Sequence, residues 1–319
     1  MRILTGLQPS GNLHIGNYFG SLRQMLQAQN NSDMFIFIAN YHAMTSNKDG
    51  ELLKENTKNI AAAYLALGIE PNSCTFWLQS DVKEVLELYW ILSQFTPMGL
   101  LERAHSYKDK IAKGLNAHHG LFSYPVLMAA DILLFDSNII PVGKDQIQHV
   151  EIARDIALKA NNEWGDVFVV PEARVDEDLA TVVGTDGAKM SKSYNNTIEI
   201  FAPTKKLKKQ ISAIITDSTA LEEPKDWRTC TVFKLASLFL NQAEQDTLKA
   251  RYEKGGEGYG HFKAFLNELI LDYFSSARAR YENLLQNPAK IQESLEIGAL
   301  KARKIAQEKM QKIYSKIGL

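Results

Sequence analysis

The sequence predicts an α/β protein in which a doubly wound parallel sheet is followed by a smaller all-helical domain. Two observations support this prediction. Short apolar runs alternate with segments of helical period through the first half of the chain, and the strand-like runs stop after about Ile200. The length of 319 residues agrees with about two domains, enough to bury a sizeable core.

Apolar runs of the first half have the length and composition of strands that are buried on both faces. The five runs are Ile3–Leu7, Met34–Ala39, Thr75–Leu78, Ile139–Val142 and Val167–Val170. Between them, apolar residues recur with helical spacing, for example from Phe19 to Leu26. Because ligands of such Rossmann-like sheets bind beyond the carboxyl ends of the strands, we expect a site after the first four runs.

After about Ile200 the chain shows helical patterns alone. The expected helices are Lys205–Ile215, Val232–Leu240, Asp246–Glu253, His261–Leu285 and Ala289–Ile317. We therefore expect a Rossmann-like domain over residues 1–195 and a helical domain over residues 196–288. The last segment, residues 289–319, is expected to be a helix that packs back on the first domain.

Composition and charge exclude several classes of protein. The 36 Lys and Arg against 37 Asp and Glu give a net charge of -1, so a polyanionic partner would need a local basic patch. The two cysteines, Cys74 and Cys230, are too few for a disulfide framework or a Cys-rich metal site. Met1–Leu7 lacks the apolar region of a signal peptide, and no run is long enough to span a bilayer. We expect a cytoplasmic protein without a membrane partner.

The segment after the first predicted strand carries a glycine turn that is suited to phosphate. It reads QPSGNLHIGN from Gln8 to Asn17 and precedes the first predicted helix. Gly11 suits a turn with positive φ, and Gly16 lets a ligand approach the backbone at the helix start. His14 and Asn17 add side-chain donors. An ordinary strand-to-helix turn remains the alternative for each residue taken singly.

A second segment, Lys189-Met190-Ser191-Lys192-Ser193, reads KMSKS. Its ammonium groups would stabilise the negative charge that develops on a pyrophosphate leaving group. The preceding stretch, Gly184–Gly187, could serve as a hinge for loop closure. The alternative is a solvated surface loop, since lysine and serine are common there.

A third segment, Tyr124–Leu133, places an acidic residue inside an apolar run. Tyr124, Met128 and Asp131 have spacings of four and three, so they share one helical face. A buried carboxylate needs a donor, and the N–H of an indole ring would supply one. The alternative is a buried carboxylate that caps a neighbouring helix. After the fourth apolar run, Gly143 permits close backbone approach and Asp145 could accept ribose hydroxyls.

These three segments together resemble the class I aminoacyl-tRNA synthetases. His14-Ile15-Gly16-Asn17 is similar to the HIGH signature with Asn in the last place, and Lys189–Ser193 matches the KMSKS signature in every letter. Gly6–Leu22 and Tyr124–Leu133 resemble the tryptophanyl branch. The resemblance implies a two-step reaction, in which tryptophan and ATP give tryptophanyl-adenylate and pyrophosphate and the amino acid then passes to tRNA(Trp). It also implies Mg²⁺ that enters with ATP, no tightly bound protein metal, and a homodimer.

The resemblance also assigns site residues. Catalytic roles fall to His14, Asn17, Lys189 and Lys192. ATP is expected to contact Gln8, Pro9, Ser10, Gly16, Asn17, Gly143, Lys144, Asp145, Val182, Lys189, Met190, Ser191, Lys192 and Ser193. L-Tryptophan is expected to contact Leu4, Gly6, His42, Tyr124, Met128, Asp131, Ile140, Val142 and Gln146, with Asp131 on the indole nitrogen and Gln146 on the ammonium group. Lys108 and Lys110 are further candidates for phosphate or for the end of the tRNA.

Transfer RNA would meet basic and aromatic side chains of the second half. The basic clusters are Lys205, Lys206, Lys208 and Lys209; Arg278 and Arg280; and Lys301, Arg303, Lys304, Lys309, Lys312 and Lys316. Tyr252, Tyr259 and Phe262 could stack on bases, although helix packing is the simpler interpretation. Three other functions stay open: a tyrosine-specific enzyme of the same class, a small-molecule nucleotidyltransferase, and an RNA-binding relative without catalysis.

Overall fold

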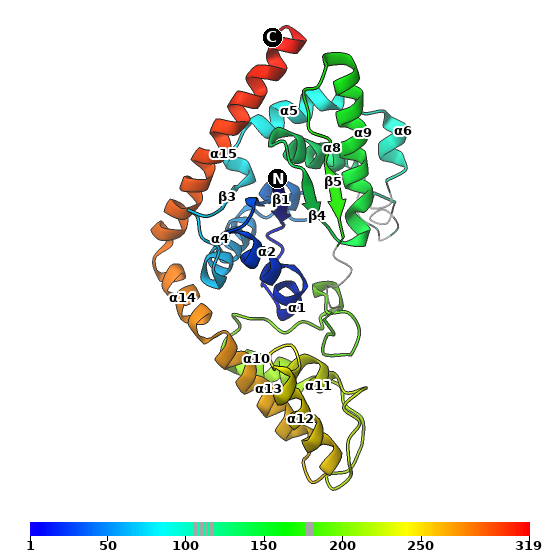
Figure 1. Cartoon of the computed structure of the whole chain (residues 1–319), viewed down its shortest axis with the longest axis vertical. Coiled ribbons are helices and arrows are strands. Elements are labelled where there is room, and N and C mark those ends of the chain that lie inside the picture. The colour runs from blue at the N-terminus through cyan, green and yellow to red at the C-terminus, as the bar shows by residue number, and fades with distance from the viewer. Residues whose placement is uncertain (105–106, 109–111, 113, 115–117, 176–181) are drawn as a thin grey trace.

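A five-stranded parallel sheet forms the centre of the part of the chain before about residue 200 (Figure 1). The computed structural model describes residues 1–104, 107–108, 112, 114, 118–175 and 182–319, except for the side chain of Asp145. The strands are β1 (Arg2–Leu7), β2 (Asp33–Ile38), β3 (Thr75–Leu78), β4 (Ile139–Pro141) and β5 (Glu172–Arg174). Their order is β3-β2-β1-β4-β5, and every neighbouring pair is parallel. The predicted α/β fold with a parallel sheet is confirmed.

The sheet is covered on both faces, as its continuous apolar strands require. In β2, Met34, Ile36 and Ile38 point into one apolar cluster, and Phe35 and Phe37 point into the other. All five side chains are buried. The alternation follows from the two-residue period of a strand, so one unbroken apolar run supplies both layers of the core.

The sequence prediction of the fifth strand is wrong. The apolar run Val167–Val170 is a loop, and the fifth strand is the polar segment Glu172–Arg174 at the sheet edge. The Asn161 side chain accepts hydrogen bonds from the backbone N–H groups of Val167 and Phe168 and donates one to the carbonyl of Phe168. The apolar run therefore satisfies its backbone through a side chain and does not need a strand partner.

Helices and short turns connect the strands. The helices are α1 (Ile15–Asn17), α2 (Arg23–Ala28), α3 (Asn40–Ala43), α4 (Gly50–Leu67), α5 (Glu84–Ser93), α6 (Met98–Glu102), α8 (His119–Leu134) and α9 (Ile147–Trp164). A π-helical turn, Tyr18–Leu22, joins α1 to α2. Short 3₁₀ turns cover Gln79–Asp81, Lys144–Gln146 and Lys192–Tyr194.

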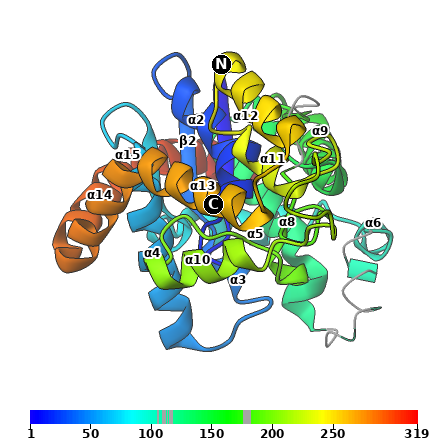
Figure 2. The same ribbon diagram turned by 90° about the horizontal axis from the view of Figure 1, so that it is seen from below.

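From Thr204 onward, the regular elements of the chain are all helices (Figures 1 and 2). Its helices are α10 (Thr204–Ser212), α11 (Thr231–Ala236), α12 (Gln242–Lys254), α13 (Tyr259–Tyr273), α14 (Ser275–Gln286) and α15 (Pro288–Ile317). The expected helix His261–Leu285 is interrupted at Phe274, whose ring is buried against Tyr18 and Phe239. Aromatic packing thus separates α13 from α14.

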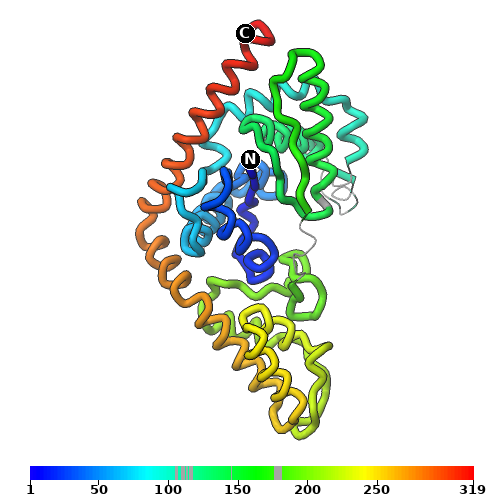
Figure 3. Tube along the Cα trace, viewed as in Figure 1, coloured from blue at the N-terminus to red at the C-terminus, as the bar shows by residue number. Residues whose placement is uncertain are grey.

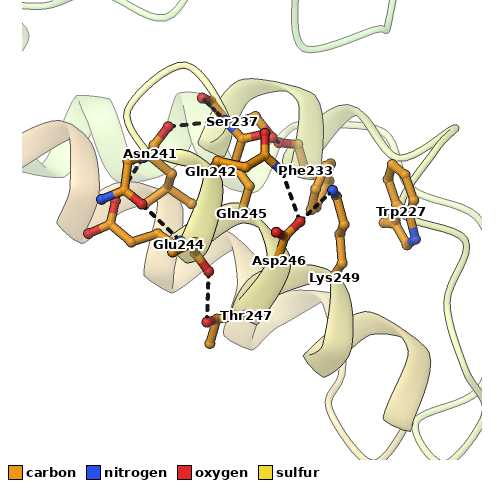
Figure 4. Close-up of polar contacts among 12 residues, drawn as sticks. Trp227, Phe233, Ser237, Asn241, Gln242, Glu244, Gln245, Asp246, Thr247 and Lys249 are labelled. Carbon is orange, nitrogen blue, oxygen red and sulfur yellow. Dashed lines mark hydrogen bonds and ion pairs between the residues drawn. The ribbon is translucent and has the colours of Figure 1, made fainter.

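Local sequence explains where α12 begins. The Asn241 side chain accepts from the backbone N–H of Glu244, and the Glu244 carboxylate accepts from the backbone N–H of Asn241 (Figure 4). This reciprocal pair satisfies two N–H groups that the helix itself leaves unpaired. Lys249 and Gln242 both donate to Asp246 farther along the same helix.

The last two helices return along one side of the molecule from the helical part toward the sheet (Figure 3). Within α15, Arg303 donates to the carbonyl of Asp81, and Lys301 donates to the carbonyl of Pro71. Lys309 is buried and bonds to the side chain of Asp136. Gly298 faces β3 so closely that an added Cβ would lie 1.9 Å from the carbonyl oxygen of Phe76. The C-terminal helix is therefore fixed to the sheet by close packing and by side-chain bonds.

Candidate active site

Two neighbouring cavities lie at the carboxyl ends of the central strands. The outer cleft measures about 730 Å³ and lies between the turn after β1, the end of β4 and the loop that contains Lys189. The inner pocket measures about 280 Å³ and lies between β1, β4 and α8. Val142 lines both cavities. Their position agrees with the topological rule for parallel sheets, because the strand order reverses at the neighbouring strands β1 and β4, with β2 and β3 on one side and β5 on the other.

The turn before α1 places a glycine and a histidine at the wall of the outer cleft. Gly16 lacks a side chain where a Cβ would lie 3.0 Å from Nδ1 of His14 and 3.3 Å from Cβ of Met190. The Asn17 side chain accepts from the backbone N–H of His14 at 3.2 Å. The small residue thus allows the histidine ring, the helix start and the KMSKS methionine to meet.

Burial keeps His14 uncharged near neutral pH. Burial, followed by the positive charge of Lys192, lowers the pKa of His14 to about 4, against a smaller opposing effect of Glu199. The side chain is 5% exposed, and its Nδ1 atom has no hydrogen-bond partner in the described part of the chain. His14 can therefore offer a neutral imidazole to a ligand in the cleft, but it is a poor source of protons at pH 7.

The KMSKS loop closes one side of the same cleft. Lys189 is exposed and lines the cleft, and Met190 is buried beneath it. The ammonium group of Lys192 donates to the carbonyl of Ser10 at 3.2 Å and to the carbonyl of Gly11 at 3.1 Å. Residues 182 positions apart in the chain are thereby joined, so the two basic side chains stand opposite the glycine turn.

All nine residues expected to contact tryptophan line the inner pocket. These are Leu4, Gly6, His42, Tyr124, Met128, Asp131, Ile140, Val142 and Gln146, joined by Gln8, Phe37, Ala39 and Ile132. The walls are mostly apolar, and polar groups are few, as in pockets that hold small molecules. Gly6 is needed because a Cβ there would lie 2.7 Å from the ring of Phe37.

Asp131 is the buried carboxylate of this pocket, with 3% exposure. Its Oδ2 atom lies 2.9 Å from Nε2 of His42, and the Gln79 amide donates to Oδ1 at 3.0 Å and to Oδ2 at 2.8 Å. Burial raises the pKa of Asp131, while the bonds from His42 and Gln79 act in the opposite direction. The two partners orient the carboxylate, and among the described residues Oδ1 accepts from Gln79 alone, which leaves it one acceptor position for a further donor.

Gln79 is a buried residue beside the pocket that the sequence did not single out. It is 1% exposed and directly follows strand β3. Its amide oxygen accepts from the backbone N–H groups of Tyr41 and His42. The Gln79 side chain therefore contacts both Asp131 and the segment that carries His42. The rule that ligand-binding residues follow the strands points to this residue, but nothing in the sequence connects Gln79 with Asp131.

Known proteins with the same sequence pattern identify the family. The family described as "tRNA synthetases class I (W and Y)" matches residues 1–275. The chain belongs to these class I tRNA synthetases. A relative from Campylobacter jejuni (strain RM1221), described as "Tryptophan--tRNA ligase", is 72% identical over all 319 residues and is covered completely. A Fusobacterium nucleatum protein of the same description is 53% identical, covering 100% of this chain and 98% of that protein.

A solved structure agrees with the fold of this class I synthetase throughout. The tryptophanyl-tRNA synthetase from Campylobacter jejuni, complexed with ADP and tryptophan, has a TM-score of 0.99 and 72% sequence identity. The match covers 100% of both chains. The parallel sheet, the surrounding helices and the enzyme class of aminoacyl-tRNA ligases are therefore confirmed.

The residues that we expected at the ATP side of the synthetase are placed less uniformly. The outer cleft is lined by His14, Gly16, Asn17, Gly143, Lys144, Val182, Lys189 and Met190, and also by Arg174, which the sequence did not single out. Gln8 lines the inner pocket instead. Pro9, Ser10, Ser191, Lys192 and Ser193 lie on the two adjoining loops without lining either cavity. The side chain of Asp145 and all of Lys110 lie outside the described residues, and Lys108 is exposed and lines neither cavity.

Several basic and aromatic residues considered for tRNA have other partners in this synthetase. Tyr252 and Phe262 are buried with ring centroids 3.9 Å apart, and Tyr259 donates to Asp217. Arg278 donates to the carbonyl groups of residues 200 and 202. These side chains pack within the helical part or bond to the segment next to it. For the three aromatic residues this agrees with helix packing, the simpler interpretation given above. The lysines of α10 remain exposed, and Lys206 pairs with Glu199 at 2.7 Å.

The described residues show neither a cluster of metal-binding side chains nor a membrane-spanning helix. Over the described ranges, three or more His, Cys, Asp or Glu side chains do not gather where they could hold a metal ion. No helix in the described part of the chain has the length and apolar character needed to cross a membrane.

Proposed function

We propose that the protein activates L-tryptophan with ATP and then transfers it to tRNA(Trp), as a tryptophan–tRNA ligase. The observation that carries this proposal is the inner pocket, where an apolar cavity of about 280 Å³ contains a buried, oriented carboxylate and opens beside a basic cleft. An indole ring fills apolar space and brings one N–H donor, which matches the acceptor position left on Asp131.

In the first step, the tryptophan carboxylate attacks the α-phosphorus of ATP in line, and pyrophosphate leaves. The inner pocket holds the amino acid, and the cleft holds the nucleotide with the Mg²⁺ that accompanies it as substrate. His14 and Asn17 hydrogen-bond phosphate oxygens, while Lys189 and Lys192 neutralise the charge that develops on the leaving group. No protein nucleophile is required, so positioning and electrostatic stabilisation supply the acceleration.

In the second step, a terminal ribose hydroxyl of the tRNA attacks the carbonyl of the adenylate, and AMP leaves. We assign catalysis to residues 1–195, anticodon recognition to residues 196–288 and a supporting role to the C-terminal helix, residues 289–319. A homodimer, with each tRNA contacting both subunits, completes the proposal. The protein works in the cytoplasm, where its substrates ATP and tRNA are used for translation.

A tyrosine-specific enzyme is the nearest competing function. A phenol O–H can donate to a carboxylate as an indole N–H does, so this part of the chemistry does not decide between them. The 72% identity to a protein described as a tryptophan ligase, over the whole of both chains, favours tryptophan. A nucleotidyltransferase for small molecules would have no use for the helical part.

Charging of tRNA tests the proposal. Purified protein, ATP, Mg²⁺ and labelled tryptophan should convert bacterial tRNA(Trp) to its aminoacylated form. Labelled tyrosine with tRNA(Tyr) serves as the control and should give no product. Adenylate formation without transfer to any tRNA would favour the small-molecule enzyme.

A further inference from the structure

We infer that Asn196 is a positioning residue of the KMSKS loop, whose buried amide holds the backbone on both sides of Met190. This inference rests on the proposed function, because it assigns Asn196 a role in the activation of tryptophan. It extends the site beyond the two lysines to a residue that does not itself line the cleft.

The Asn196 side chain is 2% exposed and uses both ends of its amide inside the loop. Its oxygen accepts from the backbone N–H of Ser191 at 2.8 Å. Its nitrogen donates to the carbonyl of Lys189 at 3.1 Å and to Oδ1 of Asp186 at 2.8 Å. Two of these three bonds therefore go to the residues immediately before and after Met190.

Two backbone features bring the amide into this position. Asn195 adopts a left-handed conformation with φ of 52°, which turns the chain back under the loop. Gly184 leaves room for the amide, since a Cβ there would lie 2.3 Å from Nδ2 of Asn196. The backbone N–H of Thr185 donates to the carbonyl of Asn196 at 3.0 Å. The loop is thus closed around the Asn196 side chain.

The consequence reaches the cleft through Met190 and the two lysines. Met190 is buried and packs at the Gly16 position of α1, so fixing its flanking peptide groups fixes the loop against the helix start. Lys189 and Lys192 lie in the loop on either side of Met190. The hydrogen bond from Asn196 lowers the pKa of Asp186 and so favours its ionised carboxylate. A charged acceptor makes a stronger hydrogen bond with the Asn196 amide than a neutral one would.

The test compares Asn196→Ala with a matched control, Asn161→Ala. The Asn161 side chain also makes three bonds to hold a loop, but that loop lies at residues 167–168, away from both cavities. For each variant we would measure kcat of tryptophan-dependent ATP–pyrophosphate exchange, the Kd of tryptophan by calorimetry, and Tm. A displaced lysine loop should lower kcat of Asn196→Ala by about 10- to 100-fold, with the tryptophan Kd within about twofold of the wild type. Asn161→Ala should lower Tm and keep kcat.

Two isosteric variants separate positioning from general loss of stability and cover the case in which Asn196→Ala does not fold. Asn196→Asp places a second carboxylate against Asp186 and should also lower kcat. The double variant Asp186→Asn/Asn196→Asp swaps the two side chains. It restores one amide–carboxylate bond in the opposite direction and should recover part of kcat. Recovery of kcat in the double variant is not expected if residue 196 affects only the stability of the protein.

The outcomes distinguish this inference from the proposed function. Wild-type exchange activity together with an unchanged kcat in Asn196→Ala, or in Asn196→Asp, would overturn the inference alone. A loss of kcat that follows Tm in the same proportion for Asn196→Ala and Asn161→Ala would also overturn it. Wild-type protein without tryptophan-dependent exchange would contradict the proposed function and this inference with it.

Discussion

At the scale of single residues, the surroundings of two buried titratable groups decide what they can do. His14 is held neutral by burial and by the nearby charge of Lys192. Asp131 is buried too, but His42 and Gln79 donate to it and compensate for part of the lost hydration. One residue can therefore act as a neutral donor, and the other as an oriented acceptor.

The lowered pKa of His14 predicts a dependence of stability on pH. Between pH 6.5 and about 4, the unfolded chain binds a proton at His14 that the folded chain does not, so the free energy of unfolding falls as pH decreases through this range. At pH 4 this contribution is up to about 3 kcal/mol smaller than at pH 7. Urea unfolding at several pH values should show that wild type loses more stability than His14→Gln. Parallel curves for the two proteins would contradict the burial of an uncharged imidazole.

Asp131 should contribute to discrimination between tryptophan and phenylalanine, although less than a carboxylate without partners would. With phenylalanine bound, His42 and Gln79 still donate to Asp131, and one acceptor position is left unfilled. We expect Asp131→Ala to reduce the ratio of kcat/KM values by roughly 5- to 30-fold, equivalent to about 1–2 kcal/mol. Asp155→Ala, on the exposed side of α9, is the control. An unchanged ratio would remove Asp131 from recognition of the ring.

Lys192 should act on the chemical step and not on binding of the amino acid. Lys192→Ala removes a charge from the loop beside the cleft and its two bonds to Ser10 and Gly11. We expect kcat of activation to fall by about 10²- to 10³-fold, with the tryptophan Kd unchanged. Lys54→Ala, exposed on α4, should leave both quantities at wild-type values. Weaker tryptophan binding with normal kcat would place Lys192 elsewhere.

At the scale of elements, close packing between α15 and β3 joins the end of the chain to the sheet. Gly298 makes this approach possible, since any side chain would meet the backbone of Phe76. Backbone atoms cannot move aside as a flexible side chain can. The position of α15 should therefore depend strongly on this one glycine.

Gly298→Ala should destabilise the protein by about 1–3 kcal/mol or more, because the helix must move away from the strand. Gly260→Ala is the matched control, since Gly260 lies in α13 with nothing within 4 Å of an added Cβ. Because Gly260 lies in the first turn of α13, alanine there should change stability by no more than about 0.5 kcal/mol. Chemical denaturation of both variants would measure these changes. Equal stability of Gly298→Ala and wild type would contradict the close approach.

Sequence reasoning succeeded where a pattern is local and failed where partners come from distant segments. Four of the five strands follow from apolar runs, but β5 is a polar edge strand whose pairing with β4 no periodicity reveals. Asp131 stands out as an acid in an apolar run, whereas Gln79 is an ordinary polar residue until folding brings it to Asp131. The KMSKS letters identify the lysines, but the role that we infer for Asn196 depends on the turn at Asn195.

At the scale of the whole molecule, the two cavities explain why one chain can join two small substrates. The apolar pocket and the basic cleft share Val142, so the proposed amino acid in the first would lie next to the proposed nucleotide in the second. The glycine turn, the end of β4 and the KMSKS loop come from three separate parts of the chain, and all three line the outer cleft. Adenylation is then largely a matter of proximity and charge.

Amino-acid-dependent exchange of label between pyrophosphate and ATP tests this central claim most directly. With ATP, Mg²⁺ and each of tryptophan, tyrosine and phenylalanine in turn, the account predicts rapid exchange with tryptophan and a far lower rate with the other two. Exchange supported by tyrosine alone, or by none of the three amino acids, would contradict it.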